Sequence, residues 1–138
     1  GINHRMGLDD AAMLKENHLA WAGGVTAAIA AVRSDAPWPA RVIVEAETSD
    51  EAQAAVAAGA DALLLDEFSP EALTTLVPLL RAQAEARPAR ASIVLEASGV
   101  NPAHLKLYAT TGVDLISTSA PMTRSSWLDL SMRFTPAG

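Results

Sequence analysis

Polar side chains that could hold a metal ion, an anion or a developing charge recur along this chain. Each stands at the end of a short apolar run: Lys15, Glu45, Asp66, Glu96 with Ser98, and Ser117 with Ser119. Carboxylate oxygens are ligands that Mg²⁺ prefers, and a lysine ammonium is a compact charge for an anion. Each residue could instead merely begin a polar loop, but the repetition of the pattern favours a shared site.

The apolar runs predict strands, and the Ala-rich stretches between them predict helices. The expected strands cover residues 12–15, 41–47, 61–67, 91–99 and 113–120. The expected helices cover residues 24–33, 49–59, 69–86 and 101–112. This alternation indicates βαβ units and a parallel sheet, and strand cores such as VIV and LLL suit burial on both faces. Because ligands bind where the carboxyl ends of parallel strands meet, the polar set is expected at that edge.

Residues that favour helix ends support these boundaries. Ser49 is expected to cap the second helix and Gly59 to end it. Ser69 is expected at the N-cap of the third helix, with Pro70 at its first position. Pro78 lies inside that helix and is expected to kink it.

The composition limits the class of protein. With 138 residues, half of them hydrophobic, the chain has room for one domain with a packed core. A net charge of -6 and a pI near 4.9 argue against a nucleic-acid partner, because no basic stripe can neutralise phosphates. The absence of cysteine excludes disulfides and thiolate metal sites. No apolar run reaches the ~18 residues of a membrane span. No secretory signal opens the sequence, so a soluble, cytoplasmic protein is expected.

Five strand–helix units leave two architectures open. A complete (β/α) barrel has eight such units in about 250 residues, so the chain is either an open five-stranded sheet or part of a barrel. The first residues favour the partial barrel. Asn3, His4 and Arg5 are suited to bind an anion, yet no strand precedes them.

Several sequence blocks resemble those of a known family. The segment NHRMGLDDAAMLKENHLAWAGG is similar to the NHR-x-GL-x-D…(I/L)K-x-NH…AGG stretch of quinolinate phosphoribosyltransferases (nicotinate-nucleotide pyrophosphorylase, carboxylating). The blocks VEAETSDEA, LLLDEFSPE, LEASG and YATTGVDLISTSA follow in the same order. The resemblance implies that residues 1–138 are the C-terminal part of a type II phosphoribosyltransferase-like α/β barrel of about five βα units. The front of the barrel and an N-terminal sandwich domain would then lie outside this chain.

The resemblance implies a pentosyltransferase of NAD biosynthesis. Such an enzyme transfers the phosphoribosyl group of phosphoribosyl pyrophosphate (PRPP) to quinolinate with decarboxylation, and it uses Mg²⁺. The products are nicotinate mononucleotide, pyrophosphate and CO₂. This chain alone is expected to be inactive.

The resemblance also assigns roles to the residues at the expected edge. His4, Arg5 and Lys15 would receive the two quinolinate carboxylates, because Arg pairs with a carboxylate in a planar fork and Lys supplies a compact charge. Glu45 and Asp66 would hold the metal and face the ribose, where carboxylates stabilise the positive charge of the transition state. These two carboxylates and Lys15 form the expected catalytic set.

Small residues of two later blocks would bind the 5′-phosphate of PRPP. They are Ser98 and Gly99, followed by Ser119 and Ala120. Small side chains after a strand let backbone N–H groups approach a phosphate. Glu47 could either bind the metal directly or contact the residues that bind it.

Four residues depart from the family pattern. Glu67 stands where the family usually has Asn, Val100 and Ser119 replace glycines, and Arg124 stands roughly in place of a His. Val100 is expected to crowd a backbone that approaches phosphate. The changes keep two alternatives open, which are a paralog acting on another pyridine carboxylate and a non-catalytic half-barrel partner subunit.

Charge balance predicts a further segment. The basic residues of this chain are too few to neutralise quinolinate and PRPP beside three carboxylates on the same edge. A second, more basic segment is therefore expected to pack against residues 1–20, and a homo-oligomer, a dimer or higher, is expected as well.

Overall fold

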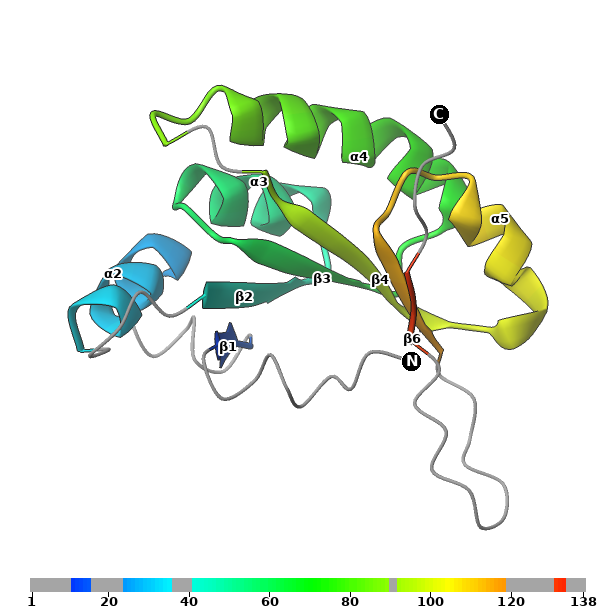
Figure 1. Cartoon of the computed structure of the whole chain (residues 1–138), viewed down its shortest axis with the longest axis horizontal. Helices are drawn as coiled ribbons and strands as arrows, with labels where there is room; N and C mark the ends of the chain where they lie inside the picture. Colours follow the sequence, from blue (N-terminus) through cyan, green and yellow to red (C-terminus); the bar gives the residue numbers. More distant parts are fainter. Residues whose placement is uncertain (1–10, 16–23, 36–40, 90–91, 119–130, 134–138) are drawn as a thin grey trace, which may run out of the picture.

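The computed structural model describes residues 11–15, 24–35, 41–89, 92–118 and 131–133 (Figure 1). One sheet contains six strands in the order β1-β2-β3-β4-β5-β6. The strands are β1 (Ala11–Leu14), β2 (Arg41–Ala46), β3 (Ala62–Asp66), β4 (Val94–Val100), β5 (Leu115–Thr118) and β6 (Ser131–Arg133). The helices are α2 (Val25–Asp35), α3 (Ser49–Ala57), α4 (Pro70–Glu85), the 3₁₀ turn η2 (Pro102–His104) and α5 (Leu105–Ala109).

The strand order decides between the two architectures. From β1 to β5 each strand pairs in parallel with the next strand along the chain. Consecutive parallel strands joined by right-handed crossovers carry all their helices on one face, whereas a doubly wound sheet needs a reversal of strand order. In Figure 1, α3 and α4 lie together over one face of the sheet, and the two helices contact each other. The fold is a partial (β/α) barrel with five parallel strands.

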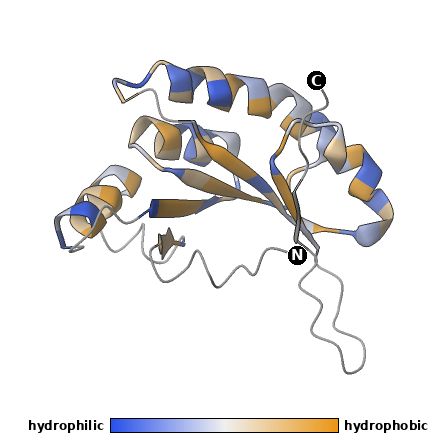
Figure 2. Cartoon of the chain, in the orientation of Figure 1, coloured by the Kyte–Doolittle hydropathy of each residue, from blue (hydrophilic) through white to orange (hydrophobic). Residues whose placement is uncertain are grey.

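The two faces of the sheet differ in burial. In β2, Val42, Val44 and Ala46 are buried, whereas Ile43 and Glu45 are partly exposed. The buried side chains join one hydrophobic cluster with residues of α3 and α4. Figure 2 shows mainly hydrophobic residues along the strands and a mixture of hydrophobic and hydrophilic residues on the helices. The face away from the helices, called the open face below, carries Glu45.

The capping prediction for α3 is wrong by one residue. Thr48, not Ser49, is the N-cap, and its hydroxyl accepts a hydrogen bond from the Glu51 N–H at 3.2 Å. The Glu51 carboxylate accepts in return from the Thr48 N–H at 3.2 Å, which completes a capping box. Gly59 follows the end of α3 with φ of +99°, as expected for a residue that ends a helix.

Helix α4 begins as predicted. The Ser69 hydroxyl accepts from the Ala72 N–H at 3.1 Å, and Pro70 is the first helical residue. The helix continues through Pro78, so this proline does not end it, and the kink stays a prediction.

Three other predictions need correction. The helix expected over residues 101–112 is only a 3₁₀ turn followed by the five-residue α5. Strand β6 pairs antiparallel to β5 and is not predicted by the sequence. Three residues are too few to reveal the alternation of apolar and polar residues that marks a strand. Strand β4 extends to Val100 through a register shift between Ala97 and Val100. None of the helices in the described parts of the chain is long and apolar enough to cross a membrane.

Candidate functional site

The parallel register brings the predicted carboxylates to one edge of the sheet. Glu45 of β2 is paired with Leu64 of β3, and Asp66 of β3 is paired with Ser98 of β4. Because side chains alternate along a strand, Leu64 and Asp66 share a face, which is also the face of Glu45 and Ser98. Glu45, Asp66 and Ser98 therefore lie together on the open face, at the carboxyl edge that the sequence pattern predicts.

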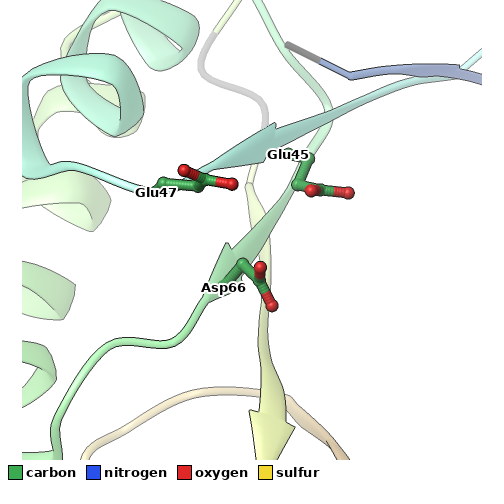
Figure 3. A group of neighbouring side chains, drawn as sticks. All are labelled: Glu45, Glu47 and Asp66. Carbon is green, nitrogen blue, oxygen red and sulfur yellow. The ribbon is translucent and has the colours of Figure 1, made fainter.

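Three carboxylates gather at this edge and form what we call the acidic cluster, namely Glu45, Glu47 and Asp66. One carboxylate oxygen of each lies within 4.8 Å of the other two (Figure 3). Glu45 and Asp66 are partly buried, and Glu47, just beyond the end of β2, is exposed. Mg²⁺ binds oxygen ligands at about 2.0–2.1 Å, so small side-chain movements would let the three oxygens share one ion. The acidic cluster fits a divalent cation, and Glu47 is close enough to Glu45 and Asp66 to take part.

Lys15 reaches the same edge from β1. Its Nζ lies 3.9 Å from Glu45 Oε2, and its side chain is largely exposed. A long contact between exposed groups adds little to stability. Lys15 thus places a positive charge beside the acidic cluster without being required to hold the fold together.

The backbone after Asp66 adopts an unusual conformation. Glu67 has φ of +57°, the left-handed region that residues with a side chain rarely occupy. Its N–H donates to the Ser98 carbonyl of β4 at 3.3 Å. Such strain persists only where the surroundings determine it, and it is common at functional sites. The strained residue directly follows a member of the acidic cluster.

Gly99 of β4 leaves space for the Asp66 carboxylate. Its φ is +73°, and a Cβ added at Gly99 would lie 3.3 Å from Asp66 Oδ1. A side chain at this position would be both strained and crowded. Gly99 therefore lets the β4 backbone approach the acidic cluster closely.

The loop between β3 and α4 is tied to a distant helix. The Tyr108 hydroxyl of α5 donates to the Phe68 carbonyl at 2.7 Å, and the Phe68 side chain is buried. Burial, and secondarily the negative charge of Glu71, raises the pKa of Tyr108, so the phenol keeps its donor proton at neutral pH. Sequence reasoning missed Tyr108, because nothing in the α5 segment indicates which carbonyl its hydroxyl will reach.

Two predictions about β4 are wrong. Glu96 does not end its strand but lies inside β4 and is only 6% exposed, although its pairing with Leu64 keeps its side chain on the face of the sheet that carries Glu45. The Val100 side chain is buried in the hydrophobic core, so it does not crowd the backbone at the edge. Ser98 and Gly99 are the partly exposed and exposed residues of β4 at the carboxyl edge.

The predicted site residues divide into two groups. The structure brings the following together at the carboxyl edge: Lys15, Glu45, Asp66, Ser98 and Gly99. The others lie outside the described residues: His4, Arg5, Ser119, Ala120 and also Arg124.

Comparison with known proteins identifies the family of the chain. The family described as "Quinolinate phosphoribosyl transferase, C-terminal domain" matches residues 1–133. The chain belongs to this family, as the resemblance of its sequence blocks predicts.

Similar proteins carry the corresponding name. The chain is 45% identical over 133 residues to a probable nicotinate-nucleotide pyrophosphorylase [carboxylating] of Synechocystis sp., with 96% of this chain and 43% of that protein covered. It is 36% identical over 132 residues to the human nicotinate-nucleotide pyrophosphorylase [carboxylating], with 95% and 42% covered. Its structure is similar to that of the nicotinate-nucleotide pyrophosphorylase of Francisella tularensis, with a TM-score of 0.72 and 36% sequence identity. The match covers 87% of this chain and 40% of the Francisella chain. The chain therefore spans less than half of the length of these relatives.

Proposed function

We propose that this chain carries part of the active site of an enzyme that transfers the phosphoribosyl group of PRPP to quinolinate. Decarboxylation would accompany the transfer and yield nicotinate mononucleotide, pyrophosphate and CO₂, a step of NAD biosynthesis. Family membership and the names of the relatives support this proposal. The observation that carries it is the acidic cluster at the carboxyl edge of a barrel wall, where enzymes of this architecture bind their substrates.

The acidic cluster is the proposed site for Mg²⁺. Glu45, Glu47 and Asp66 would hold the ion through one oxygen each. When bound, Mg²⁺ would neutralise charge on the departing pyrophosphate. The partly buried carboxylates of Glu45 and Asp66 would also stabilise the positive charge that develops on the ribose, because charges fixed in a site need no reorganisation during the reaction.

Anion-binding groups are proposed on both sides of the acidic cluster. His4, Arg5 and Lys15 would bind the carboxylates of quinolinate, and the position of Lys15 beside Glu45 supports a shared site. Ser98 and Gly99 would bind the 5′-phosphate together with Ser119 and Ala120. Gly99 is exposed and has no side chain of its own, which supports that role.

A further segment is part of the proposal. The chain covers 43% of the Synechocystis relative, so this relative has a substantial segment that the chain does not match. We propose that such a segment supplies the front of the barrel, the sandwich domain and additional basic groups, and that it packs over the open face. Residues 1–138 would then be the C-terminal part of the barrel domain. A homo-oligomer and a cytoplasmic location stay predictions.

The test uses the assembled protein, meaning this chain together with the segment that supplies the remaining length of the family. We expect PRPP, quinolinate and Mg²⁺ to yield nicotinate mononucleotide and CO₂. Asp66→Asn should lower kcat about 100-fold while changing the quinolinate KM little, since it acts mainly on the transition state. Asp35→Asn, at an exposed carboxylate ending α2, is the matched control and should leave both constants unchanged.

Two outcomes would favour the alternatives. Quinolinate binding without turnover would indicate a non-catalytic half-barrel, and turnover of a different pyridine carboxylate would indicate a paralog. Equal kcat values for Asp66→Asn and Asp35→Asn would overturn the assignment of the acidic cluster.

A further inference from the structure

The turn that follows Asp66 is held in place from two sides. On one side, the strained Glu67 donates its N–H to Ser98 of β4 at 3.3 Å, near the upper limit for a hydrogen bond. On the other side, the Tyr108 hydroxyl donates to the Phe68 carbonyl at 2.7 Å. The shorter of these two tethers comes from α5, a helix that is distant in sequence.

The Tyr108 tether is suited to hold a strained backbone. A left-handed Glu67 tends to relax toward negative φ, and relaxation would rotate the peptide that carries the Phe68 carbonyl. The hydrogen bond from Tyr108 and the burial of the Phe68 side chain both oppose that rotation. The first turn of α4 is fixed independently by its Ser69 cap.

Gly99 limits where the Asp66 carboxylate can lie on one side. Its Oδ1 lies 3.3 Å from the position that a Cβ at Gly99 would occupy, so β4 bounds the carboxylate on that side. One carboxylate oxygen of Glu45 and one of Glu47 lie within 4.8 Å of an Asp66 carboxylate oxygen. A change in the turn would therefore redirect Asp66 relative to Glu45 and Glu47.

We propose that Tyr108 is a positioning residue of the acidic cluster. Its hydroxyl binds the Phe68 carbonyl and so fixes the turn after Asp66. The fixed turn keeps Glu67 in its left-handed conformation. That conformation directs the Asp66 carboxylate toward the metal position. This inference rests on the proposed function for the metal that the cluster would bind. The hydrogen bond, the backbone conformation and the close approach of Gly99 are independent of it.

Tyr108→Phe in the assembled protein tests the inference, because it removes the hydroxyl and keeps the ring. The matched control is Thr111→Val, which removes another short hydroxyl-to-carbonyl hydrogen bond, from Thr111 Oγ1 to the Tyr108 carbonyl at 2.6 Å. Both variants lose one such bond at the same helix, but only Tyr108→Phe releases the turn.

The first measurement is hydrogen exchange over residues 66–69. We expect Tyr108→Phe to raise the exchange rate of the Glu67 amide at least 5-fold, with Thr111→Val unchanged. The second measurement is a Mn²⁺ titration in the presence of pyrophosphate. We expect the dissociation constant for Mn²⁺ to rise about 3- to 10-fold in Tyr108→Phe, with kcat lowered at limiting Mg²⁺ and partly restored at high Mg²⁺.

Each outcome has a defined meaning. Equal exchange and equal Mn²⁺ affinity in Tyr108→Phe and Thr111→Val would overturn the inference and leave Tyr108 with a structural role. A wild-type protein that binds no Mn²⁺ would also overturn it, because no metal position would exist. A wild-type protein that binds Mn²⁺ but does not convert quinolinate would overturn the proposed function alone, and the exchange and titration would still decide the role of Tyr108.

Discussion

The two edges of the sheet use acidic residues in different ways. At the amino edge, Asp61 precedes β3, and its Oδ2 accepts from the Val42 N–H at 2.7 Å and from Arg33 at 3.3 Å. The same Arg33 donates to the Gly59 carbonyl at 2.7 Å. Asp61 thus joins β2, β3 and the end of α2.

The arrangement is repeated two strands later. Asp114 precedes β5, and its carboxylate accepts from the Leu95 N–H at 2.8 Å and from Arg81 at 3.1 Å. Arg81 also donates to the Gly112 carbonyl at 2.6 Å. The amino edge therefore carries the same clamp twice, and each carboxylate is used within the chain.

At the carboxyl edge the acidic residues are arranged differently. Glu45, Glu47 and Asp66 bring like charges together, and Lys15 lies 3.9 Å from one of them, Glu45. The turn after Asp66 is strained at Glu67. In barrels of this type the carboxyl edge serves catalysis and the amino edge serves stability. The same residue type therefore stabilises the fold at the amino edge and gathers into the acidic cluster at the carboxyl edge.

The largest effect on stability is expected at the amino edge. Asp114→Ala leaves the Leu95 N–H without its side-chain acceptor, and the free energy of unfolding should fall by about 2 kcal/mol. Urea unfolding of the assembled protein measures the loss, and Asp35→Ala should change it by less than about 0.5 kcal/mol. The kcat of the remaining folded protein should equal that of the wild type. A clear fall in kcat for Asp114→Ala would break the distinction between the edges.

A smaller effect of opposite sign is expected at the carboxyl edge. Glu67→Asn should raise the free energy of unfolding by about 0.5–1 kcal/mol relative to Glu67→Gln, because Asn adopts the left-handed conformation more readily. Both variants remove the same charge, so the difference between them reports the backbone strain alone. Thermal unfolding of the pair measures it, and equal stabilities would show that the turn at Glu67 is not strained.

The smallest effect concerns pH. Burial, and then Glu71, raises the pKa of Tyr108 above its ordinary value of 10.0, so the folded protein holds the phenol proton more tightly than the unfolded chain. The stability linked to this proton is fully present below pH 10.0 and is lost as the pH rises through the folded-state pKa. The stability advantage of wild type over Tyr108→Phe should therefore shrink above that pH. An advantage that grows there would contradict the burial of Tyr108.

Much of the fold could be predicted because the strands are continuously apolar and the helices carry local capping signals. The Glu45 and Asp66 positions follow directly from where such strands end. The N-cap of α3 was also readable, since Thr48 stands three residues before Glu51 in the pattern of a capping box. Ser49 has Ala52 three residues later, which cannot complete such a box.

Other features depend on tertiary structure and leave little trace in the sequence. The burial of Glu96 in the middle of β4 is one example, and the register shift between Ala97 and Val100 is another, since no local pattern marks either. The left-handed conformation of Glu67 is imposed by its neighbours against its own preference. The Tyr108 tether joins residues that only the packing of α5 brings together.

The central claim is that the acidic cluster serves a ligand, whereas Asp114 serves the fold. One thermal-unfolding experiment tests both, with the assembled wild type, Asp66→Asn and Asp114→Asn measured with and without Mg²⁺ and pyrophosphate. Ligand binding should raise the wild-type Tm by several degrees, because a ligand that binds only the folded state stabilises it. We expect Asp114→Asn to melt lower but show the same rise, and Asp66→Asn to melt near the wild type and show no rise. A full rise in Asp66→Asn, or its loss in Asp114→Asn, would contradict the claim.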